Sequence, residues 1–64
     1  MSINDAYYDK LKLLYKFCKI NHFITKHASE DAKKEHDEQF EKFLKEITPT
    51  LQKYIQQLDT MIKK

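Results

Sequence analysis

The sequence KHASEDAKKEHDEQF, residues 26–40, separates two segments whose apolar residues recur at helical spacing, so the position of the turn within it decides the fold. Ser29 is a favourable N-cap. Glu30 and Asp31 follow it, and carboxylates in a first helical turn complement the positive end of the helix dipole. We therefore predict a turn at residues 27–28 and a second helix that begins directly after the cap.

The same stretch places two histidines among carboxylates, which raises the question of a metal site. Ligands on one helix must be three or four residues apart, and His36 has no His, Cys, Asp or Glu at those distances. The alternative is a cluster of Cys18, His22 and His36, because residue 22 would lie opposite roughly residue 35 in the predicted hairpin. We predict that Cys18 is a small buried apolar residue and that His36 enters the apolar seam, and we assign no metal and no cofactor.

Apolar residues follow a helical period on both sides of this stretch. On the N-terminal side the repeat, with Ser2 as a weak cap, predicts a helix over residues 3–27. On the C-terminal side one phase continues over residues 30–63, which predicts a long second helix.

Pro49 leaves two alternatives for the second helix. A proline inside a helix removes a hydrogen bond and costs about 3 kcal/mol, and Thr48 and Pro49 also form a fair N-cap and N1 pair. The apolar phase nevertheless runs from Ile47 to Leu51 without a slip. The second helix is therefore either continuous with a kink at 48–49, or broken there with a third helix beginning at Pro49.

The apolar faces of the two helices differ in width, and this difference predicts the architecture. The stripe of the second helix covers about 120° of its circumference, whereas that of the first covers at least half. A narrow seam cannot cover a wide one. We predict an all-α antiparallel helical hairpin that forms a dimeric four-helix bundle, with a monomeric three-helix bundle as the alternative. The residues expected at the dimer interface are Leu11, Leu14, Leu51, Tyr54, Leu58 and Met61.

Length and composition limit the class of protein. A chain of 64 residues forms at most one domain, whose core is marginal unless a disulfide, a metal or a second chain adds to it. One cysteine excludes an internal disulfide and is typical of a reducing compartment. No apolar run approaches the roughly 18–20 residues of a membrane-spanning helix, and the N-terminus has no signal-peptide pattern. We expect a cytoplasmic protein without membrane contact.

Enzymatic patterns are absent from the sequence. Without glycine there is no glycine-rich phosphate loop, and the two serines are better explained as helix caps. The carboxylates of the second helix alternate with lysines on what must be a solvated face. A chain this short also has little room for a pocket that excludes water. We therefore expect no catalytic residues and no enzyme activity.

Charge is unevenly distributed along the chain. Residues 10–28 contain five lysines and no acid, whereas residues 29–46 contain seven acids and four lysines. Phe23 lies among lysines on an otherwise polar side of the first helix, where it has no evident core role. The residues of this basic-aromatic stripe are Tyr8, Lys12, Tyr15, Lys16, Lys19, Phe23 and Lys26.

The basic-aromatic stripe suggests three interpretations. It binds another protein, since aromatic residues are enriched at interfaces and lysines steer an acidic partner; an inhibitor, antitoxin, immunity or adaptor protein needs only such a surface. Alternatively it binds RNA, with lysines on phosphates and Phe23 or a tyrosine stacked on a base. Because all twelve cations are lysine and base recognition relies heavily on arginine, we favour protein binding. In the third interpretation the lysines only pair with acids of the second helix, for example Lys19 with Glu38.

Overall fold

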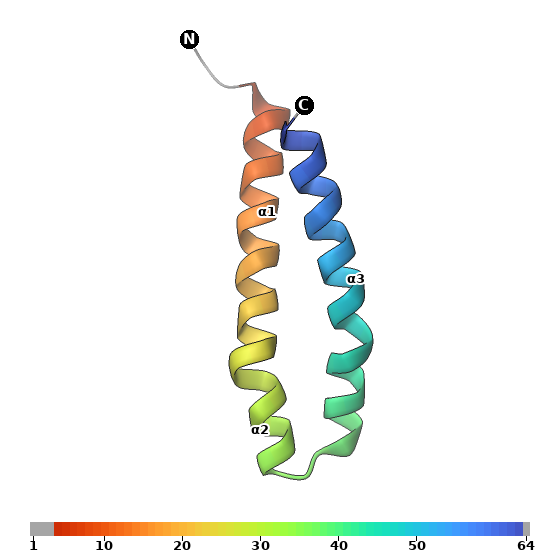
Figure 1. The fold of residues 1–64 in the computed structure, drawn as a ribbon. Helices are drawn as coiled ribbons and strands as arrows, with labels where there is room; N and C mark the ends of the chain where they lie inside the picture. The colour runs from red at the N-terminus through yellow and green to blue at the C-terminus, as the bar shows by residue number, and fades with distance from the viewer. Residues whose placement is uncertain (1–3, 64) are drawn as a thin grey trace.

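The computed structural model describes residues 4–63, which form two antiparallel helical arms joined by a short turn (Figure 1). The first arm runs without a break through α1 (Asp5–Phe23), the π-helical turn η1 (Ile24–Ala28) and α2 (Ser29–Lys34). The second arm is α3 (Glu38–Lys63). The hairpin is 52 Å long and 17 × 13 Å in cross-section. The predicted all-α class and the antiparallel hairpin are confirmed.

The first arm starts at a polar cap and continues past the predicted turn. Asn4 is the N-cap of α1, and its Oδ1 accepts a hydrogen bond of 2.8 Å from the backbone N–H of Tyr7. The cap predicted at Ser2 lies outside the described residues. The helix does not end at 27: Ser29 lies inside it, so both the turn at 27–28 and the cap at Ser29 are wrong. Helix continuation is favoured because it places Ala28 in the core.

The π-helical turn explains how the first arm keeps its apolar side facing α3. Ile24, Ala28 and Ala32 are four residues apart, and in an α-helix of 3.6 residues per turn such a series drifts by about 40° at each step. In η1 the backbone N–H of Ser29 donates to the carbonyl of Ile24, the i→i+5 pattern of a wider turn. A π-helical turn contains more residues than an α-helical turn, so it offsets the rotation of this series around the helix. Ile24, Ala28 and Ala32 are consequently all buried.

Three residues, Glu35, His36 and Asp37, make the turn between the arms. His36 has a positive φ of 57°, and its N–H donates to the carbonyl of Lys33 at 3.2 Å, while the N–H of Asp37 donates to the carbonyl of Ala32 at 2.9 Å. These two bonds form a Schellman motif, in which the residue with positive φ is usually glycine. The Asp37 Oδ1 then accepts from the N–H of Phe40 at 3.1 Å and caps α3. The predicted place of His36 in the seam is therefore wrong, because His36 lies in the turn.

The second arm is one helix that contains Pro49. It begins at Glu38 instead of residue 30, because the turn lies eight residues later than predicted. The helix continues through Pro49, and the Thr48 hydroxyl donates to the carbonyl of Leu44 at 2.8 Å one turn earlier. The third helix of the alternative fold is therefore not formed, while a kink at 48–49 stays a prediction. Apolar packing along one side, buried at Leu44 and Leu58, offsets the cost of the proline.

The core is concentrated at the turn end of the hairpin. Ile24, Ala28, Ala32 and Leu44 form one buried cluster, against which Ile47 and Leu51 pack. Towards the open end, Leu58 is the one further apolar residue that is buried among the described residues. The two alanines are small, which allows the arms to approach closely beside the turn. The open half of the hairpin consequently has much less buried apolar surface than the turn half.

The cap at Asp37 generates a prediction that separates the true helix start from the predicted one. Replacing Asp37 by Ala removes the side-chain acceptor for the Phe40 N–H and should lower the free energy of unfolding by about 1 kcal/mol. Replacing Ser29 by Ala should change it by no more than about 0.5 kcal/mol, because Ser29 lies inside a helix, where alanine is favourable. Urea denaturation followed by circular dichroism measures both. A larger loss for Ser29→Ala than for Asp37→Ala would contradict this turn.

The positive φ of His36 generates a second prediction. A left-handed conformation costs an L-residue roughly 1–2 kcal/mol but costs glycine nothing of that kind, while glycine loses more entropy on folding. His36→Gly should therefore stabilise the hairpin by about 0.5–1 kcal/mol in the same denaturation experiment. The matched control is His27→Gly, within the helical first arm, which should destabilise it by about 1 kcal/mol. Equal destabilisation by the two substitutions would show that residue 36 is helical.

Candidate protein-binding surface

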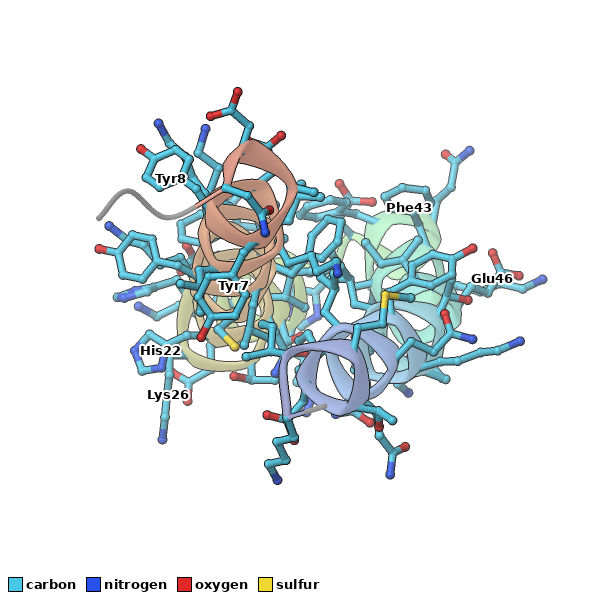
Figure 2. All side chains as sticks on the ribbon, turned by 90° about the horizontal axis from the view of Figure 1, so that it is seen from above. Tyr7, Tyr8, His22, Lys26, Phe43 and Glu46 are labelled. Carbon is cyan, nitrogen blue, oxygen red and sulfur yellow. The ribbon has the colours of Figure 1, made fainter. Side chains whose placement is uncertain are left out.

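The basic-aromatic stripe lies on the outer side of the first arm, with Lys26 in η1 and the other six residues in α1. All seven of its residues are exposed, and the exposed fractions of its three aromatic side chains are 51% for Tyr8, 62% for Tyr15 and 58% for Phe23. Tyr8 and Lys26 project from the side of the first arm that faces away from α3 (Figure 2). The helix thus brings the predicted residues onto one surface, and none of them contributes to the intramolecular core.

Lysine and tyrosine side chains within the stripe contact each other one helical turn apart. The Nζ of Lys12 lies 5.4 Å from the ring centroid of Tyr8 and donates to its hydroxyl at 3.3 Å. The Nζ of Lys19 lies 5.3 Å from the ring centroid of Tyr15. Both distances are typical of cation–π pairs. Each ammonium keeps further N–H donors that a partner's carboxylate can accept from.

These contacts belong to a seven-residue repeat that the sequence interpretation missed. A ring-bearing residue is followed four positions later by a lysine, and the pairs recur every seven residues: Tyr8 with Lys12, Tyr15 with Lys19, and His22 with Lys26. Positions seven apart drift by only about 20° on a straight helix, so the pairs form a nearly straight row along the first arm. His22 and Lys26 project from the same side of that arm (Figure 2). His22 therefore extends the stripe. The seven-residue period of the ring and lysine pairs was the sequence signal that could have revealed this residue.

In the third interpretation of the stripe, its lysines pair with acids of the second helix, for example Lys19 with Glu38. The structure does not form that pair. Between described side chains, the ion pairs are Glu41–Lys45 at 3.9 Å and Asp59–Lys63 at 2.9 Å, both within α3. Glu38 lies at the turn end, whereas Lys19 lies in the middle of the first arm, because the turn is at 35–37. The stripe lysines are left available to another molecule.

The structure does not bring Cys18, His22 and His36 together. His36 lies in the turn at the end of the first arm, fourteen residues beyond His22, and fourteen residues correspond to about 21 Å of helix rise. Within residues 4–63 no group of three His, Cys, Asp or Glu residues is placed to hold a metal ion. Cys18 is exposed instead of buried, so that prediction was wrong. Its side of α1 borders a groove between the arms and not the seam itself.

That groove marks one long side of the hairpin and is largely polar along α3. It is lined from the first arm by Leu14, Cys18, Asn21, His22 and Thr25, and from α3 by Gln52, Ile55, Gln56 and Asp59. The Oδ1 of Asn21 is buried and has no hydrogen-bond partner among residues 4–63. The residues of both arms that border this groove lie on one long side of the hairpin. Residues that project from the two helices in the opposite direction therefore lie on the other long side.

The six residues predicted for a dimer interface do not share one surface. Leu58 is buried between the arms, and Leu14 and Leu51 are half-buried in the same intramolecular seam. Leu11, Tyr54 and Met61 remain exposed. The division follows from the side of α3 that each residue occupies: Leu51 and Leu58 face α1, whereas Tyr54 and Met61 lie beside the seam.

Comparison of the chain with protein-family models, with curated proteins and with solved structures finds no match. In the part of the chain that the structure describes, the helices are too short or too polar to cross a membrane.

The exposure of Cys18 generates a prediction about its reactivity. A thiol-specific reagent such as dithionitrobenzoate should label Cys18 in the folded protein within about tenfold of its rate in denaturant, because accessibility does not limit the reaction. The measurement is the absorbance of the released thiolate, with and without urea. Labelling that requires unfolding would show that Cys18 is covered in solution.

Proposed function

We propose that this protein acts in the cytoplasm by binding another protein, without catalysis, through the basic-aromatic stripe of α1. The observation that carries the proposal is the exposure of Tyr8, Tyr15 and Phe23, each more than half accessible on the first arm. Aromatic residues of this kind are the anchors of many protein interfaces. An inhibitor, antitoxin, immunity or adaptor protein would use such a surface.

The partner's surface should be acidic and should contain apolar pockets between its carboxylates. The lysines of the stripe supply positive charge along one line, which accelerates encounter with a negative surface and sets the orientation of binding. The rings between them supply the apolar contact area. Cation–π contacts such as that of Lys19 with Tyr15 hold the ammonium groups near the rings, so less side-chain entropy is lost when the partner binds.

A homodimer is part of this proposal. A single core in a chain below roughly 70–80 residues rarely supplies more than about 3–5 kcal/mol. Here five apolar side chains are buried within the described hairpin, and two of them are alanines. A second hairpin is the simplest way to complete a four-helix bundle.

The proposed binding generates a prediction for two substitutions in the stripe. Phe23→Ala removes a ring and Lys16→Glu reverses a charge, and each should weaken binding of the partner at least tenfold, about 1.4 kcal/mol. The experiment captures proteins from the native cell extract on the immobilised chain and then measures the affinity of the captured partner. Lys53→Glu is the matched control, since it makes the same charge change at an exposed lysine of α3.

The nucleic-acid alternative is separated in the same experiment by nuclease treatment and by salt. A partner held through RNA is lost on nuclease treatment, and its binding falls steeply and linearly in log K against log salt concentration. Equal capture by the wild-type chain, Phe23→Ala and Lys16→Glu would show that the stripe binds nothing.

A further inference from the structure

The side of the hairpin opposite the polar groove carries a continuous apolar surface. In α1, Leu14 and Asn21 face α3, and Cys18 and His22 lie toward the groove. Leu13 and Ile20 each precede one of the facing residues and so lie about 100° to the other side. In α3, Leu51 and Leu58 face α1, and Phe43, Tyr54 and Met61 lie about 40–80° away from them, on the side opposite Gln52 and Gln56. This apolar face comprises Leu13, Phe17 and Ile20 of α1 with Phe43, Ile47, Tyr54 and Met61 of α3.

Five of the seven residues of this apolar face are exposed, while Phe17 and Ile47 are half-buried. The exposed fractions are 46% for Leu13 and Ile20, 51% for Phe43, 46% for Tyr54 and 49% for Met61. Phe43 lies on the opposite side of the hairpin from Lys26 (Figure 2). Along α3, Ile47, Tyr54 and Met61 recur every seven residues, the spacing by which one helix packs against another in a bundle.

We propose that a second copy of this chain covers the apolar face. The side of the hairpin that carries this face is 52 Å long and 17 Å wide, and a standard stable interface buries about 800 Å² on each partner. The apolar residues span positions 13–20 of the first arm and 43–61 of α3. A copy of the chain also supplies the buried surface that the open half of the hairpin lacks.

The charge distribution determines the relative orientation of the two copies, antiparallel or parallel. The open half, residues 5–22 and 50–63, contains six lysines and three aspartates, a net charge of +3; the turn half, residues 23–49, contains five lysines and seven carboxylates, a net charge of −2. Packing the turn half of one hairpin on the open half of the other brings opposite charges together, whereas the parallel order brings like charges together. The long axes of the two hairpins therefore run antiparallel, with the turn of each copy beside the open end of the other.

The antiparallel order predicts which residues meet. The two-fold axis passes near the middle of the hairpin, so Ile20 lies beside Ile20 of the other copy, and the two α1 helices are neighbours. Phe43 then lies near Met61 of the other copy, a pair of aromatic ring and thioether that attract each other. The basic-aromatic stripe lies outside the apolar face. The dimer would therefore display two stripes, and it does not depend on the partner that they bind.

The first experiment tests the dimer with the full chain by sedimentation equilibrium. The wild-type chain should sediment at twice the mass of one chain, and Phe43→Glu with Tyr54→Glu should raise the dissociation constant at least 100-fold, because each carboxylate would be desolvated in the interface. Tyr8→Glu with Tyr15→Glu, the same change on the stripe, should leave the dimer intact. A wild-type chain that sediments as a monomer, or equal effects of the two pairs, overturns the proposal.

The second experiment tests the order of the copies and does not depend on how well charged variants fold. In a Cys18→Ser background, Ile20→Cys should form an intermolecular disulfide under mild oxidation, since the two residues face each other near the axis. Lys33→Cys is the control for random collision: it follows the buried Ala32, lies about 100° toward the groove side and outside the apolar face, and should form none. Cross-linking at 33 as fast as at 20, or none at 20 in a sedimenting dimer, overturns the antiparallel order. Loss of partner binding with an intact dimer would instead concern the stripe alone.

Discussion

The pair of backbone hydrogen bonds that His36 and Asp37 donate at the end of the first arm determines every contact between the arms. They end α2, allow His36 to adopt its positive φ and place the Asp37 carboxylate where it caps α3. The turn then sets the register of the hairpin. With a turn at 27–28 residue 22 would face roughly residue 35, and with the turn at 35–37 it faces about residue 50. Leu58 is buried as a consequence of this register.

Features that depend on local periodicity could be predicted from the sequence, and the turn could not. The all-α class and the shared surface of the stripe follow from apolar or polar residues at helical spacing, and the unbroken apolar phase at Pro49 was the reason to keep a continuous second helix as one of two alternatives. The turn was misplaced because Ser29 followed by two acids has the same local chemistry as Asp37 followed by Glu38. The choice between them rests on burial of Ala28 and Ala32, a tertiary effect that no local pattern reports.

The absence of glycine made this choice harder to foresee. A glycine at C′ is the usual sign of a helix end, and histidine is one of the few other residues that adopt a positive φ with some frequency. A histidine among carboxylates first suggested a metal site, but the structure gives His36 a conformational role. The error then spread, because the alternative cluster of Cys18, His22 and His36 and the pairing of Lys19 with Glu38 both assumed the earlier turn.

The proposed dimer and the proposed binding surface divide the circumference of α1 between them. One side of α1 packs on α3, an adjacent side carries Leu13 and Ile20 of the apolar face, and the outer side carries the stripe. The width of the apolar arc on the first helix, which suggested a second partner at the outset, would thus be accounted for by two different neighbours. In α3 the pairs Glu41–Lys45 and Asp59–Lys63 bring both signs of charge together. In the first arm, by contrast, residues 10–28 contain five lysines and no acid. A partner selected by charge would therefore recognise the first arm and not α3.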